Sequence, residues 1–176
     1  MRRRLSTFKP TGYDKGRNVL WQVAWLAVSG TVFRSWICPS KLRVLILRAF
    51  GANISSGVLI RHRVRIHWPW KLSVGPNTWI GEGVWILNLE EVSIGSDVCV
   101  SQEAFICSGS HKASSSAFDF DNAPIRIEDG VWLCAQSAVL RGVTVGSDSV
   151  IGARSLVTKN VPPAATVLAP VAAVAV

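Results

Sequence analysis

Histidine is the residue type of this chain best suited to proton transfer, and it occurs only as His62, His67 and His111. A neutral imidazole can take a proton near neutral pH, so each histidine is a candidate general base. His111 ends a regular segment, residues 94–111, and an irregular serine-rich stretch follows it. Because a side chain at the end of a regular pattern can meet a substrate, we predict that His111 is the catalytic residue.

The cysteines suggest no metal site. Cys38, Cys99, Cys107 and Cys134 include no Cys-x-x-Cys pair and no spacing typical of zinc ligands. Their sequence neighbours are apolar, which predicts buried, reduced thiols. Reduced thiols agree with a cytoplasmic location.

An aliphatic residue that recurs every six positions predicts the architecture that must position His111. The 16 unit starts are all Ile, Leu or Val, and the residue four positions later is Val, Ser, Thr or Ala in 13 units. The starts are Ile54, Ile60, Ile66, Leu72, Val74, Ile80, Ile86, Ile94, Val100, Ile106, Ile127, Leu133, Val139, Val145, Ile151 and Val157. Six is the period of hexapeptide parallel β-helices, in which three units form one triangular coil with the aliphatic starts inside.

The fold class is therefore predicted to be mainly β, a parallel β-helix of about five coils with an N-terminal helical segment. We expect the helical segment to cover residues 1–51, the β-helix residues 52–163 with an inserted loop at 112–124, and an apolar tail residues 164–176. Glycine directly follows five of the starts, at Gly75, Gly81, Gly95, Gly146 and Gly152. We expect these glycines to relieve backbone strain at the corners.

The helical segment contains an apolar run at residues 19–33, and Asn18 is placed to cap it. The run is shorter than the roughly 20 residues of a membrane span. Two interpretations remain: a helix packed on the solenoid or on a neighbouring subunit, which we favour, and a helix lying in a membrane interface.

A second helix is predicted at residues 40–51. Ser40 can cap this helix and Gly51 can end it. Its apolar stripe is expected to be Leu42, Leu45, Ile46 and Ala49.

Net charge points to an anionic partner. The formal charge is +8, and seven of the 19 basic residues lie in the first 34 positions. Nucleic acid, an anionic membrane surface and a phosphorylated cofactor all fit this charge. The basic residues form no patch interleaved with aromatic residues, so nucleic acid is not expected.

Several segments carry a resemblance to the hexapeptide-repeat acyltransferases, above all to the acetyltransferases of colanic acid and other exopolysaccharide pathways. They are GYDKGRN (12–18), FRSWICPSKLRVLILRAFGANI (33–54) and residues 67–111 and 123–163. The most specific motifs are GSH before the inserted loop and VTKNVPP near the end. The resemblance implies a left-handed β-helix, a homotrimer, and transfer of acetyl from acetyl-CoA to a sugar hydroxyl in exopolysaccharide or lipopolysaccharide biosynthesis.

The same resemblance implies roles for individual residues. His111 matches the family's catalytic histidine. Asn88 lies near an acceptor-binding asparagine of that family, although it could equally be a turn residue. The positions that match acetyl-CoA contacts are Trp132, Ala135, Ala153, Thr158 and Lys159. Trp132 could also pack at a trimer interface, and no metal is expected.

Two alternatives stay open. The apolar tail lacks the Gly, Asn and basic residue that relatives place after the Pro-Pro pair, so the chain could be a non-catalytic scaffold in a polysaccharide assembly complex. A γ-carbonic-anhydrase-like metalloenzyme would use three histidines on zinc, but there the lone histidine precedes the pair, whereas His111 follows His62 and His67. We expect a cytoplasmic protein, with peripheral contact at the inner face of the membrane as a further option.

Overall fold

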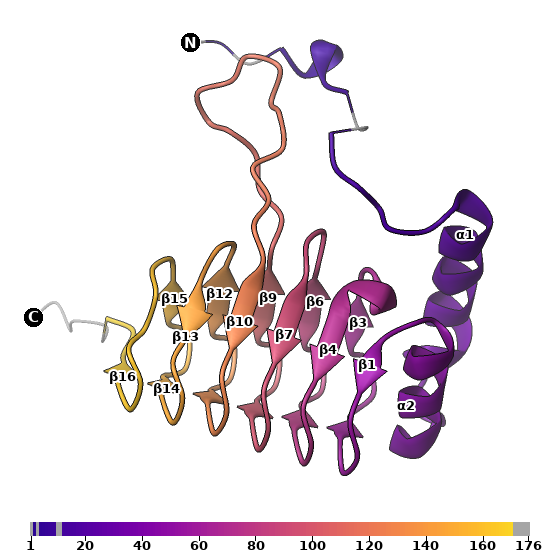
Figure 1. The fold of residues 1–176 in the computed structure, drawn as a ribbon, viewed down its shortest axis with the longest axis vertical. Helices are drawn as coiled ribbons and strands as arrows, with labels where there is room; N and C mark the ends of the chain where they lie inside the picture. Colours follow the sequence, from indigo (N-terminus) through magenta and orange to yellow (C-terminus); the bar gives the residue numbers. More distant parts are fainter. Residues whose placement is uncertain (1, 3, 10–11, 171–176) are drawn as a thin grey trace, which may run out of the picture.

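A stack of short parallel strands forms the body of the protein (Figure 1). The computed structural model describes residues 2, 4–9 and 12–170. The strands form three sheets with the orders β1-β4-β7-β10-β13, β2-β5-β8-β11-β14-β16 and β3-β6-β9-β12-β15, here called faces A, B and C. Each strand pairs with the strand one coil later, so the chain is a parallel β-solenoid. Five coils are complete and β16 belongs to a sixth, which confirms the predicted architecture.

The elements are short, as expected for a triangular coil. The helices are η1 (Leu5–Thr7), α1 (Val19–Val28), η2 (Ser29–Phe33), α2 (Ser40–Ala49) and η3 (Pro69–Lys71). The strands are β1 (Asn53–Ile54), β2 (Leu59–Ile60), β3 (Arg65–Ile66), β4 (Leu72–Val74), β5 (Trp79–Ile80), β6 (Trp85–Leu87), β7 (Val92–Ile94), β8 (Cys99–Val100), β9 (Phe105–Cys107), β10 (Ile125–Ile127), β11 (Trp132–Leu133), β12 (Ala138–Leu140), β13 (Thr144–Val145), β14 (Val150–Ile151), β15 (Leu156–Val157) and β16 (Thr166–Val167).

The predicted unit starts line the interior of the solenoid. All 16 are buried, and like side chains stack from coil to coil, as Ile80 does between Ile60 and Val100. Burying an aliphatic side chain contributes roughly 1.5–3 kcal/mol, so these columns hold the coils together. β16 lies inside residues 164–176, which were predicted from the sequence to be an apolar tail. The last six residues of that tail, 171–176, are outside the described residues.

The glycines after the unit starts are not needed to relieve backbone strain, which is the reason predicted from the sequence. The left-handed backbone at the corners between faces A and B is supplied by other residues, among them Asn77 and Asp97. Gly75 has no positive φ, but a Cβ on it would lie 2.5 Å from the carbonyl carbon of Gly95 in the next coil. These positions therefore need glycine because successive coils approach closely there.

The N-terminal helices close the first end of the solenoid (Figure 1). Asn18 caps α1 as predicted, its Oδ1 accepting from the backbone N–H of Trp21 at 3.0 Å. Trp25 is fully buried, and its indole N–H donates to the carbonyl oxygen of His67 at 2.9 Å. Packing of this helix on the solenoid is thus confirmed. Within residues 2, 4–9 and 12–170, no helix is both long and apolar enough to cross a membrane.

Two expectations for α2 were wrong. The buried residues of the helix are Arg43, Val44 and Leu47, and the predicted stripe turns largely outward. Arg43 can be buried because its guanidinium donates to the carbonyl oxygens of Phe33, Ser35 and Ile60.

The hydroxyl of Ser40 does not cap α2. It accepts from the backbone N–H of Ile60 at 2.8 Å and so ties the helix to β2. Gly51 ends the helical region as expected, with φ of +93°.

Candidate active site

A hairpin-like stalk, residues 108–124, leaves the solenoid between β9 of face C and β10 of face A (Figure 1). Its two arms are joined by backbone hydrogen bonds, for example from Lys112 N–H to Asp119 O and from Asp121 N–H to Ser110 O, both at 2.8 Å. Asp121 also pairs with Arg141 of the following coil. The stalk is therefore anchored at the edge between faces A and C.

His111 lies on this stalk with one ring nitrogen already engaged. Its Nδ1 is 2.6 Å from the carbonyl oxygen of Phe118. Because a carbonyl oxygen can only accept, Nδ1 carries the proton and Nε2 holds the lone pair. The ring also stacks on Phe118 at 3.9 Å between centroids. The imidazole is thus held in the tautomer of a general base.

An aromatic cluster surrounds His111. The ring of Phe8 in the N-terminal segment forms T-shaped pairs with the rings of His111 and Phe120, with 5.4 and 5.3 Å between ring centroids. The rings of Tyr13 and Phe120 form a similar pair with 4.9 Å between centroids. Sequence reasoning missed Phe8 and Tyr13 because they are about a hundred residues from the stalk and follow no periodic pattern. They show that the N-terminal segment helps to build the surroundings of the histidine.

Asn88 is buried, and its amide is fully used inside the chain. Its Oδ1 accepts from the backbone N–H of Trp68 at 3.0 Å, and its Nδ2 donates to the carbonyl oxygens of Trp68 and Lys71 at 2.6 and 3.1 Å. Asn88 therefore fastens the inserted turn η3 to the next coil. The acceptor-binding role predicted for it finds no support in this geometry.

The other two histidines do not join His111. The Nε2 of His62 lies 3.2 Å from a carboxylate oxygen of Glu82. His67 is partly buried, and burial lowers its pKa to about 4, with a smaller contribution from the charge of Lys15. Among the residues that the structure describes, no three His, Cys, Asp or Glu side chains gather to hold a metal ion.

The residues predicted to hold acetyl-CoA lie on face B and at the two edges of face C. Trp132 projects outward from β11, and its indole N–H donates to the hydroxyl of Ser101 at 2.9 Å. Ala135 and Ala153 lie in successive corners between faces B and C, where Arg154 N–H donates to the carbonyl oxygen of Ala135 at 3.0 Å.

Thr158 and Lys159 directly follow β15, and both are exposed. They lie at the end of β15 that leads towards face A, whereas Ala153 precedes the same strand. Ala153 and the pair Thr158 and Lys159 therefore flank β15 at its two ends, whereas Ala135 lies one coil earlier and Trp132 lies on face B.

The three faces turn different side chains outward. On face A the register aligns Asn53, Ser73, Ser93, Arg126 and Thr144. On face B it aligns Leu59, Trp79, Cys99, Trp132 and Val150. On face C it aligns Arg65, Trp85, Phe105, Ala138 and Leu156. Face A is polar, whereas faces B and C are mostly apolar.

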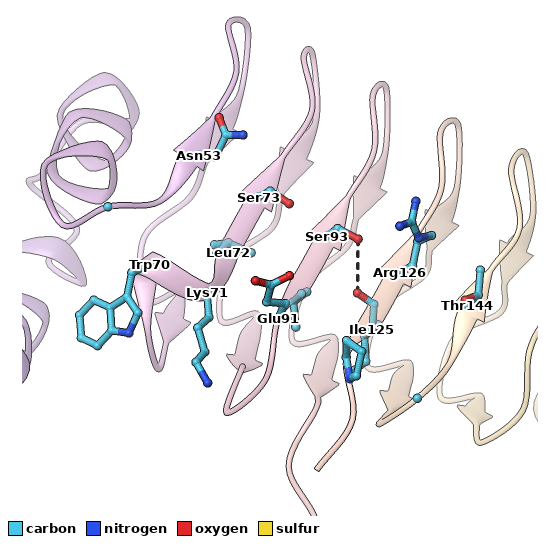
Figure 2. A pocket seen from close by; sticks show the side chains of 14 residues that line it. Asn53, Trp70, Lys71, Leu72, Ser73, Glu91, Ser93, Ile125, Arg126 and Thr144 are labelled. Atoms are coloured by element: carbon cyan, nitrogen blue, oxygen red, sulfur yellow. Dashed lines mark hydrogen bonds between the residues drawn. The ribbon is translucent and has the colours of Figure 1, made fainter. Parts of the chain in front are cut away.

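A groove of about 680 Å³ runs along face A, beside the root of the stalk. Figure 2 shows Trp70 and Glu91 at its border and Ser73, Ser93 and Arg126 on its floor. The guanidinium of Arg126 is exposed and has no hydrogen bond or ion pair with any other described residue. The groove thus offers hydroxyl groups, the guanidinium of Arg126 and the ring of Trp70 to a ligand.

Known proteins identify the family. No protein-family model matches the chain. Over 156 residues it is 40% identical to the protein of Escherichia coli strain K12 named colanic acid biosynthesis acetyltransferase WcaF, which covers 87% of this chain and 84% of WcaF. The chain belongs to this acetyltransferase family.

Solved structures agree with the fold of this acetyltransferase. A hexapeptide-repeat acetyltransferase of Vibrio cholerae, solved with acetyl coenzyme A, superposes with a TM-score of 0.77 at 21% identity, over 90% of this chain and 88% of that one. A galactoside acetyltransferase solved with coenzyme A gives a TM-score of 0.74 at 19% identity, over 91% of this chain and 84% of that one. The predicted family and solenoid are both confirmed.

Proposed function

We propose that this acetyltransferase moves an acetyl group from acetyl-CoA to a sugar hydroxyl during exopolysaccharide biosynthesis, with His111 as general base. The relative that is 40% identical is named for colanic acid biosynthesis, which supports the glycan acceptor. The observation that carries the assignment of His111 is its Nδ1 contact with the carbonyl oxygen of Phe118, which leaves the lone pair on Nε2.

In the proposed reaction, Nε2 of His111 takes the proton of the sugar hydroxyl as its oxygen attacks the thioester carbonyl carbon. A carbon–oxygen bond forms, the carbon–sulfur bond breaks, and the leaving thiolate recovers the proton from the imidazolium. The carbonyl of Phe118 keeps the ring oriented through this reaction.

We propose that acetyl-CoA binds along the border of β15 and in the neighbouring corners. The small side chains of Ala135 and Ala153 allow a pantetheine arm to lie close to the backbone. The exposed ammonium of Lys159 can meet a phosphate, and Thr158 offers a hydroxyl beside it. The indole of Trp132 can pack against the arm or against a neighbouring subunit.

We propose a homotrimer that packs through faces B and C. The solenoid exposes large apolar side chains there, including Trp79, Trp132 and Leu156. Exposed apolar surface of this kind typically marks a protein interface. Face A, with its polar side chains, would then stay open to solvent.

The open groove on face A is our candidate for the acceptor glycan. Hydroxyl and guanidinium groups can hydrogen-bond sugar hydroxyls, and Trp70 can pack on the apolar face of a sugar ring. The stalk leaves the solenoid beside the groove, at Pro124. A glycan bound in the groove would therefore extend towards His111.

We place the enzyme in the cytoplasm, peripherally at the membrane. All four cysteines are free, which suits a reducing compartment. The outward surface of the N-terminal helices supports the membrane contact.

The test is acetyl transfer by the purified full-length protein. Acetyl-CoA is mixed with nucleotide-linked sugars, lipid-linked sugars and oligosaccharides, and both the released thiol and the acetylated product are measured. We expect thiol release that depends on a glycan and matches the product in amount. Release equal to the acceptor-free background with every glycan would favour the non-catalytic scaffold.

A further inference from the structure

The outer surface of the N-terminal helices is unusually apolar for a surface in water. The described part of the chain exposes 15 large hydrophobic side chains, and ten of them fall within residues 19–45. They are Val19, Leu20, Trp21, Val23, Leu26, Val32, Trp36, Ile37, Leu42 and Leu45, here called the apolar cap. A monomer rarely leaves so many large apolar side chains together in solvent, which points to an interaction surface.

Helix α1 shows how this surface arises. Its inner side is occupied by Trp25, which is buried against the solenoid. Its opposite side carries Val19, Leu20 and Val23, and Leu20 is 82% exposed. A surface helix normally places charged residues on that side. Here neither side is charged, and the outward side has no packing partner among the described residues of the chain.

The positive charge of the protein is concentrated in its N-terminal helical segment. Residues 1–51 contain ten of the 19 basic residues and one of the 11 acidic residues, whereas residues 52–176 contain nine basic and ten acidic residues. The helical segment therefore carries a net charge of +9 and the remainder −1. No acidic residue occurs from Lys15 to Gly81. Arg4 and Lys9 lie in the N-terminal segment that reaches the stalk, but residues 15–51, which contain the apolar cap, still carry six basic residues and no acidic residue.

We propose that the apolar cap docks on an anionic lipid bilayer, with its apolar side chains in the headgroup region and the basic residues against lipid phosphates. Interfacial helices bind membranes through this combination of buried apolar area and positive charge. Exposed Trp36 and Ile37, together with the neighbouring cations Arg34 and Lys41, provide both features in one short stretch.

A second copy of the chain is a poorer occupant. The cap covers one end of the solenoid, whereas faces B and C run along its sides (Figure 1). In the proposed trimer, subunits that pack side by side would bring three caps to the same end. That end would then bind a flat surface at three points, and the combined avidity would exceed that of one cap. This multivalency rests on the proposed trimer, but docking of a single cap does not.

The test measures sedimentation of the full-length protein with vesicles and needs no acetyl transfer, so its outcome is independent of the enzymatic assay. We expect binding to phosphatidylcholine vesicles that contain phosphatidylglycerol to be at least about tenfold tighter than to phosphatidylcholine alone, and to weaken as salt increases. The double variant Leu20→Glu/Val23→Glu should bind the anionic vesicles at least about tenfold more weakly.

Leu168→Glu is the matched control, because Leu168 is 74% exposed and lies outside the cap. It should change vesicle binding by less than about threefold. Arg34→Gln/Lys41→Gln tests the charge separately and should weaken binding to anionic vesicles without changing apolar side chains.

The wild-type protein and the double variant should have the same mass by light scattering. The proposal is overturned if the wild type does not bind anionic vesicles, or if Leu20→Glu/Val23→Glu and Leu168→Glu weaken binding equally. A lower mass of the double variant, with no vesicle binding by the wild type, would identify a second copy as the occupant.

Discussion

Face A of the solenoid differs from faces B and C in the side chains turned outward, although all three have the same aliphatic interior. The residues that alternate with the buried starts are polar along face A, as Ser73 and Ser93 are, and apolar along face B, as Trp79 and Trp132 are. The repeat constrains only the inward positions. The outward positions can therefore be used for assembly on two faces and for a ligand on the third.

The stalk lies at the edge of face A. Of the changes proposed here, removal of its histidine should have the largest effect, and that effect is on catalytic turnover. We expect His111→Ala to lower kcat by roughly 10²- to 10⁴-fold, the usual contribution of a general base, while the affinity for acetyl-CoA stays within about twofold. Steady-state kinetics and calorimetry measure the two quantities. His62→Ala is the control, and an equal loss of turnover in that variant would place the chemistry elsewhere.

A charge on an apolar face should disrupt assembly. Leu156 projects from face C and is 62% exposed. If this face packs on a neighbour, Leu156→Glu buries an unpaired carboxylate, and we expect trimer association to weaken by about a hundredfold or more. Light scattering over a range of concentrations measures this. Ser73→Glu on face A should leave the mass unchanged. If Ser73→Glu lowers the mass and Leu156→Glu does not, the subunits pack through face A and not through face C.

His67 lies at the other end of the solenoid from the stalk, where it is partly buried beside α1, and it should make the stability of the protein depend on pH. Burial lowers its folded-state pKa from 6.5 to about 4, so between these values the unfolded state binds more protons. Stability should therefore fall as the pH drops through this window, by about 2 kcal/mol between about pH 7 and about pH 4.5.

Urea unfolding at the two pH values measures this loss. His67→Gln should remove that part of the pH dependence, while His62→Gln should keep it. Identical pH dependence in His67→Gln and the wild type would show that His67 is not the group responsible.

The groove on face A should make the smallest difference, since it would bind only the part of the acceptor away from the reacting hydroxyl. Arg126→Ala should raise KM for an oligosaccharide acceptor by about tenfold and leave kcat nearly unchanged. Arg63→Ala removes an exposed cation from a corner between faces B and C and serves as the control. An unchanged KM in Arg126→Ala would argue against a glycan on face A.

The sequence by itself determined the solenoid. A six-residue period leaves no alternative to stacked coils, and every predicted start is buried because only the interior can accept an unbroken column of aliphatic side chains. It also singled out His111, because the period breaks there, and Asn18, because its cap is a local interaction.

Only the tertiary structure decided what depends on contacts between distant residues. The buried side of α2 could not be predicted, because Arg43 enters the interior only when the carbonyl oxygens of Phe33 and Ile60 are there to accept its hydrogen bonds. The buried position of Asn88 likewise depends on η3, one coil earlier, because its side chain bonds to the backbone of Trp68 at the start of that turn. The tautomer of His111 depends on the fold of the stalk, since no spacing in the sequence reveals which carbonyl its Nδ1 will meet.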